Sequence, residues 1–178
     1  MQSKYFLSIW IYPYIPVEIR NFILLRSNNK ILLNYQLSRF TSSGTHCSFC
    51  IFFPITYDTL ETPEHLFFSC PVTKNLIDSY FSDFINDFHP NWKESFFKGI
   101  KSNDSKLRTY VNIEITLFTH YIYCARNMKK LPSLNGLKYH ISLIKNEMIS
   151  VSKKYKSIIE YLLMRNDGKF RELLRNLV

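Results

Sequence analysis

The strongest constraint on the fold of this chain is a set of four potential metal ligands between residues 47 and 70. Two residues separate the first two cysteines, and this spacing forms a turn that directs both sulfurs at one ion. Thr62, followed by a proline, is typical of a helix start, which places the histidine in the first turn of a short helix and the third cysteine at its far end. The sequence therefore predicts a structural Zn²⁺ ion in a closed CCHC zinc knuckle, held by Cys47, Cys50, His65 and Cys70.

Two residues beside these ligands have more than one interpretation. His46 could replace a ligand, although this would break the geometry of the C-x2-C turn. Glu61 lies four residues before His65, where it either orients the free ring nitrogen of that histidine from the second shell or is a solvated acid near a helix start. A catalytic zinc keeps an open coordination position, and four protein ligands leave none, so we expect a structural metal.

The cysteine spacing also favours a reducing compartment. A C-x2-C pair more often shares a metal or performs redox chemistry than forms a scaffold disulfide. No apolar run approaches the ~20 residues needed to span a bilayer. Pro13 and Pro16 interrupt the apolar N-terminal stretch, which otherwise has the look of a signal peptide. We therefore expect an intracellular protein with no membrane partner.

The hydrophobic pattern predicts an all-α fold, with no convincing strand pair. Several short helices around the knuckle are followed by two long antiparallel helices and a short terminal helix; the expected segments are 16–26, 31–40, 71–88, 92–97, 104–128, 137–162 and 169–177. Glu114 interrupts the apolar stripe of the first long helix. The second carries an unbroken heptad seam from Leu137 to Leu162, with lysines such as Lys145 off the seam.

These elements divide the chain into two parts. Residues 1–91 hold the N-terminal helices, the knuckle and the helix that follows it. Residues 92–178 form a basic helical hairpin extension, which we expect to pack with the first part as one unit.

The basic charge is unevenly distributed. The chain has a net charge of +9, but residues 47–91 carry −5, whereas residues 92–178 hold 17 basic and 7 acidic residues, net +10. Such a surface suits an anionic partner, RNA or DNA, although a charge cluster can also be only a solvated face. The candidate phosphate contacts are Arg126, Lys129, Lys130, Lys153, Lys154 and Lys156. Tyr121 and Tyr123 could stack on bases, but aromatic residues on a long amphipathic helix are more often part of the core.

The strings Cys47-Ser-Phe-Cys50 and Glu61-Thr-Pro-Glu-His65-Leu-Phe-Phe-Ser-Cys70-Pro resemble the zinc-binding domain that follows the reverse transcriptase in non-LTR retrotransposon proteins. Flanking stretches at 16–22 and 123–133 extend the resemblance over residues 13–145, although the loop between Cys50 and His65 is long. The resemblance implies that the three cysteines and the histidine are zinc ligands. It also implies binding of element RNA or target DNA during target-primed reverse transcription.

The acids of this chain are scattered, and they do not form the paired carboxylates that nucleotide transfer requires. We therefore expect no enzyme, but a nucleic-acid-binding module of low sequence preference, monomeric on its own and nuclear rather than cytoplasmic. The alternative is a protein-interaction scaffold, which would dock on a reverse transcriptase or self-associate through the 137–162 seam. A Cys124–His120 pair could imitate a thiol–imidazole dyad, but nothing in the sequence supplies an orienting carboxylate or an oxyanion hole.

Overall fold

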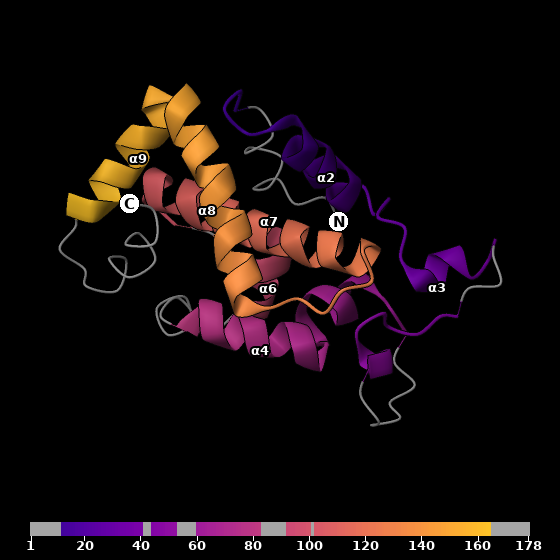
Figure 1. Ribbon diagram of the computed structural model, residues 1–178. Coiled ribbons are helices and arrows are strands. Elements are labelled where there is room, and N and C mark those ends of the chain that lie inside the picture. The colour runs from indigo at the N-terminus through magenta and orange to yellow at the C-terminus, as the bar shows by residue number, and fades with distance from the viewer. Residues whose placement is uncertain (1–11, 41–43, 53–59, 83–91, 101, 165–178) are drawn as a thin grey trace.

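The all-α fold class is confirmed. A computed structural model describes residues 12–40, 44–52, 60–82, 92–100 and 102–164, and within these ranges it is mostly helical and contains no strand (Figure 1). An isolated antiparallel bridge joins His46 to Leu60. Among the helices of the described ranges, none is both long and apolar enough to cross a lipid bilayer.

Most of the predicted helices are present. In chain order they are α2 (Val17–Ser27), α3 (Asn34–Leu37), the 3-10 turn η1 (Cys50–Phe52), the π-helical turn η2 (His65–Ser69), α4 (Pro71–Tyr80), α6 (Trp92–Lys98), α7 (Ser105–Asn127), α8 (Leu134–Val151) and α9 (Lys153–Met164). The segment predicted as helical at 31–40 is helical only over α3. The end of the predicted 71–88 helix and the whole 169–177 helix lie outside the described residues.

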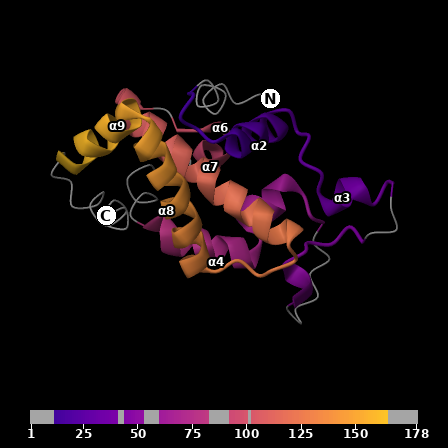
Figure 2. The same cartoon turned by 45° about the horizontal axis from the view of Figure 1, so that its top comes forward.

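Helix α7 lies at the centre of the fold. α2, η2, α8 and α9 all contact it, and Figures 1 and 2 show α9 near its start and α3 beyond its far end. Every residue from 111 to 119 is buried, so this part of α7 has no solvent-facing side. Buried residues before and after residue 92 belong to one hydrophobic core around this helix.

The predicted second long helix is wrong in one respect, because it consists of two helices. α8 ends at Val151 and α9 begins at Lys153, with Ser152 between them in an extended conformation (φ −139°, ψ 109°). The Ser152 hydroxyl accepts a hydrogen bond from the N–H of Tyr155 (3.1 Å) and so caps the start of α9. Val151, which a continuous seam would bury, is 66% exposed at the break.

The two helices together nevertheless run back over α7, since α8 begins near the end of α7 and α9 contacts its start. Tyr121, near the end of α7, donates a hydrogen bond to the carbonyl of Ser133 just before α8 (3.3 Å). Tyr161 of α9 donates to Asp104 at the start of α7 (3.0 Å). Figure 1 shows α8 crossing the front of α7 between these two points. The other seam residues, Leu137, Ile141, Ile144, Met148, Tyr155, Ile158 and Leu162, are buried in this arrangement.

Glu114, the interruption in the apolar stripe of α7, is paired with a second buried charge. Lys145 of α8 forms an ion pair with its carboxylate, and the two side chains are 1% and 0% exposed. Tyr80 donates a hydrogen bond to the same carboxylate (2.9 Å), and Lys145 donates to the hydroxyl of Tyr110 (3.0 Å). Burial lowers the pKa of Lys145 well below its usual value. Lys145, expected only to lie off the seam, is therefore an internal residue.

Two helices end with a residue in the left-handed conformation. After α2, Asn29 has φ 53°, and after α7, Lys129 has φ 54°. The N–H of Lys129 bonds to the carbonyl of Arg126 and that of Lys130 to the carbonyl of Ala125 (both 3.0 Å), which is the Schellman pattern. Glycine and asparagine suit this position, whereas lysine is strained there because its Cβ crowds the following carbonyl oxygen.

Replacing Lys129 with glycine should therefore stabilise the fold. The left-handed conformation costs an ordinary residue about 1–2 kcal/mol, and the greater freedom of glycine in the unfolded chain offsets about 0.5–1 kcal/mol of this gain. We expect Lys129→Gly to raise the free energy of unfolding by roughly 0.5–1 kcal/mol in urea denaturation. Asn29→Gly is the matched control and should gain less, because asparagine already tolerates the conformation. A Lys129→Gly protein less stable than the parent would contradict the assignment of strain to this residue.

Candidate metal centre

The four predicted ligands converge on one point. The Sγ atoms of Cys47, Cys50 and Cys70 and a ring nitrogen of His65 all lie within 4.8 Å of one another. Cys70 Sγ is 3.9 Å from Cys47 Sγ and 3.7 Å from Cys50 Sγ, and Cys50 Sγ is 3.3 Å from His65 Nε2. A tetrahedral zinc ion with ligands at about 2.3 Å (sulfur) and about 2.0–2.1 Å (nitrogen) would separate two sulfurs by about 3.8 Å and sulfur from nitrogen by about 3.5 Å. The cluster could therefore hold a metal ion, and its spacing fits tetrahedral coordination.

The turn η2 explains how two ligands five residues apart reach the same point. In an α-helix, residue i+5 lies about 140° around the axis from residue i, which would direct the two side chains apart. η2 is instead closed by a hydrogen bond from the Cys70 N–H to the His65 carbonyl (2.7 Å), and this wider turn brings Cys70 back to the side of His65. The Thr62 hydroxyl accepts a hydrogen bond from the His65 N–H (3.1 Å), which confirms the predicted helix start.

The cluster is partly shielded from solvent. Cys47 and Cys70 are fully buried, whereas Cys50 and His65 are half-buried. The hydrogen bond from the Cys47 thiol lowers the pKa of Cys70, and backbone N–H groups in the first turn of α4 add to this shift. The N-terminus of a helix stabilises a thiolate in the same way. Cys70 is therefore placed to act as an anionic ligand.

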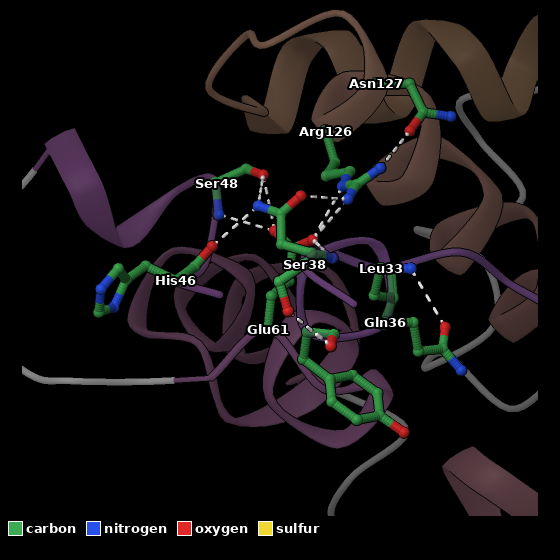
Figure 3. Close-up of polar contacts among 10 residues, drawn as sticks. Leu33, Gln36, Ser38, His46, Ser48, Glu61, Arg126 and Asn127 are labelled. Atoms are coloured by element: carbon green, nitrogen blue, oxygen red, sulfur yellow. Dashed lines mark hydrogen bonds and ion pairs between the residues drawn. The ribbon is translucent and has the colours of Figure 1, made fainter. Parts of the chain in front are cut away.

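Glu61 supports this site by a different route from the predicted one. The sequence suggests that its carboxylate orients His65, but its hydrogen bonds go to other residues (Figure 3). Its Oε2 accepts bonds from the backbone N–H and the hydroxyl of Ser48, at 2.7 and 2.6 Å. Its Oε1 accepts a bond from the backbone N–H of Asn34 (2.9 Å). Because Ser48 lies within the C-x2-C turn, Glu61 holds the turn that presents the first two cysteines instead of the imidazole.

Arg126 completes this network and is a buried residue. Its side chain is 9% exposed, and its Nε and Nη2 donate to Glu61 Oε1 at 2.9 and 2.7 Å. The guanidinium also donates to the side-chain oxygens of Asn34 (2.7 Å) and Asn127 (2.9 Å). Because Glu61 already neutralises its charge, Arg126 is not placed to bind phosphate as predicted.

The other predicted phosphate contacts are exposed, and they form two separate groups: Lys129 and Lys130 after α7, and Lys153, Lys154 and Lys156 in α9. α9 lies near the start of α7, whereas the first group follows its end (Figure 1). A helix of 23 residues is roughly 35 Å long, so the two groups do not form one patch. Lys156 also lies 3.9 Å from Glu160, which reduces its availability.

The two tyrosines of α7 serve mainly in packing. Tyr121 is half-buried, and its hydroxyl bonds to Ser133. Tyr123 is half-buried against Phe22, with ring centroids 5.4 Å apart. These contacts agree with the core interpretation of the aromatic residues and not with base stacking.

Cys124 and His120 do lie together. Cys124 Sγ is 3.6 Å from His120 Nε2, and His120 Nδ1 is 3.2 Å from His140 Nε2. Burial raises the pKa of Cys124, and burial together with His140 lowers the pKa of His120 to about 4. Both shifts favour the uncharged pair, which is the opposite of the thiolate that reacts as a nucleophile. His46, the alternative metal ligand, is exposed and lies outside the cluster.

Asn34 and Ser48 are residues of this site that the sequence did not identify. The Asn34 amide donates to the carbonyl of His46 (2.8 Å) and to the hydroxyl of Ser48 (3.1 Å), which ties α3 to the knuckle. The position of Ser48 between two ligand cysteines is a local signal. Asn34 and Arg126 are 92 residues apart in the chain, so no local pattern connects them.

Comparison of this chain with protein-family models, with curated proteins and with solved structures gives no match. The description of the metal centre therefore depends on its own geometry.

Replacing Arg126 with methionine should destabilise the protein strongly. The change keeps much of the side-chain volume but leaves the buried Glu61 carboxylate without its cation, and breaking such a pair costs about 3–5 kcal/mol. Lys130→Met, at an exposed residue just after the same helix, should change the free energy of unfolding by no more than about 0.5 kcal/mol. Urea denaturation of both variants measures the difference, and equal effects would contradict the structural role of Arg126.

Proposed function

We propose that the Cys47–Cys50–His65–Cys70 cluster holds a structural zinc ion, and that the chain is a zinc-stabilised nucleic-acid-binding module with no polymerase activity of its own. The observation that carries the zinc assignment is the convergence of three sulfurs and one imidazole nitrogen within 4.8 Å. Zinc prefers this ligand set and tetrahedral geometry. Four protein ligands leave no position for water or substrate, which supports a structural role.

The nucleic-acid part of the proposal is supported by charge and by the motif. Residues 92–178 carry a net charge of +10, and the lysines at the start of α9 are exposed to solvent. A surface of this kind attracts phosphates without sequence preference. The motif around the cluster resembles the zinc-binding domain of non-LTR retrotransposon reverse transcriptases, for which nucleic acid is the expected partner. A nuclear location would follow from that partner.

A protein-interaction scaffold is the second candidate. Its original basis, the 137–162 seam, is largely buried against α7, which favours the hairpin within one chain. The outer face of α8 still exposes two large apolar residues, Tyr139 (72%) and Leu143 (57%), one helical turn apart. A partner such as a reverse transcriptase could contact this smaller surface.

Removing the metal should unfold the knuckle. Structural zinc in finger-type sites contributes on the order of 10–16 kcal/mol, whereas the net stability of a domain is only about 5–15 kcal/mol. Native mass spectrometry should find one zinc ion per chain. A chelator should remove it together with the hydrogen-exchange protection of residues 44–52 and 60–70. A metal-free protein that keeps this protection would overturn the zinc assignment.

Binding to nucleic acid should weaken steeply as salt rises. Each phosphate that the protein neutralises contributes about −0.7 for single strands, or about −0.9 for duplexes, to the slope of log affinity against log salt. Fluorescence anisotropy should show a reduced slope for a triple Lys→Gln variant at Lys153, Lys154 and Lys156. The matched control is the same change at Lys74, Lys93 and Lys98, which are paired with nearby acids. A flat salt response of the parent protein would refute phosphate binding.

A further inference from the structure

A groove lies beside the metal cluster, at the point where four segments of the chain meet. Its volume is about 590 Å³, within the range of natural ligand sites, which is about 300–1,000 Å³. The lining residues come from α3, from the approach to the C-x2-C turn and the turn itself, from η1, and from the end of α7: Asn34, Leu37, Gly44, His46, Ser48, Ile51, Phe52, Arg126, Asn127 and Lys129. The groove is therefore large enough for one or two units of a flexible polymer chain. It is concave and not a flat surface.

The charges around this groove favour an anion. None of its described lining residues is an acid. Glu61, which bonds to the lining residues Asn34, Ser48 and Arg126, is buried, and Arg126 neutralises its charge. Lys129 is an exposed residue of the lining, and the exposed Lys130 follows it. A cation in a concave site attracts phosphate.

The conformation of Lys129 gives a second reason to assign it a function. It occupies the left-handed position that ends α7, where glycine or asparagine would fit without strain. Asn29 fills the equivalent position after α2. Strained residues persist where the surrounding structure or a function maintains them, and this lysine lines the groove beside the C-x2-C turn.

Two other lining residues offer an apolar surface for a base. Ile51 and Phe52 of η1, directly after the second ligand cysteine, are 68% and 52% exposed. An exposed aromatic ring beside a cation is the combination with which proteins hold single strands, because the ring stacks on a base while the cation binds the backbone. A duplex keeps its bases stacked inside and could offer this groove only its phosphates.

We propose that this groove binds single-stranded nucleic acid, with a backbone phosphate at Lys129 and an unstacked base on Phe52. The inference rests on the proposed nucleic-acid-binding function, and it adds a single-strand contact in the groove beside the metal centre to the phosphate contacts proposed for α9. RNA and DNA share the required chemistry, phosphodiester and base, and both belong in the test.

The test compares labelled single-stranded RNA, single-stranded DNA and a DNA duplex of the same sequence, by anisotropy with the full zinc-loaded chain. The two groove variants are Phe52→Ala and Lys129→Gly. Phe52→Ala should weaken single-strand binding by roughly 5- to 150-fold, since one stacked base contributes about 1–3 kcal/mol. Lys129→Gly should reduce the salt slope by about 0.7, while its melting temperature stays at or above that of the parent. Weaker binding by a protein that is not less stable separates the lost contact from misfolding.

The controls are Tyr139→Ala, an exposed aromatic on α8, and Asn29→Gly, the other left-handed helix end. Neither should change single-strand affinity. Unchanged binding by both groove variants, combined with a loss in the α9 triple-lysine variant, would overturn the groove and leave the nucleic-acid function standing. Duplex binding as tight as single-strand binding would also overturn it. Absence of binding to every probe at low salt would reject the groove and the proposed function together.

Discussion

The ion pair between Glu61 and Arg126 joins the metal centre to the helical core. One carboxylate accepts bonds from Ser48 in the C-x2-C turn, from Asn34 at the start of α3, and from the guanidinium at the end of α7. Three segments far apart in sequence therefore share one buried charge and its counter-ion. A buried carboxylate is tolerated only while these partners remain, so the pair fixes the position of the turn relative to α7.

A second buried pair, Glu114 with Lys145, does the same for the other end of the fold. Residues 111–119 of α7 are enclosed on all sides, so a charge in this segment cannot turn toward solvent and must find a partner in a neighbouring helix. Lys145 provides it from α8, with Tyr80 and Tyr110 as additional hydrogen-bond partners. The two pairs act as specific ties within a core that is mostly apolar.

Local chemistry made much of this structure predictable. The four ligands follow from their spacing, and the helix starts at Thr62 and Asp104 follow from capping side chains that bond within three residues. Two of the errors have one cause, because each depends on a partner that periodicity does not reveal. Arg126 looked like a surface base and Lys145 only like a residue off the seam because Glu61 and Glu114 are distant in sequence. The break at Ser152 is different, since a serine N-cap is a local signal, but the regular heptad spacing on both sides concealed it.

The same geometry connects the metal to the proposed groove without direct contact. One wall, from Ser48 to Phe52, belongs to the segment that carries two ligand cysteines, and the other wall is the end of α7. Glu61 and Arg126 hold these walls together. If the groove binds single strands, loss of zinc abolishes binding by displacing Phe52, although the ion adds no charge to the nucleic-acid contact. The metal-free protein would keep Lys153 and Lys154 on α9 and Lys129 after α7, so phosphate binding that survives chelation does not depend on the wall that carries Phe52.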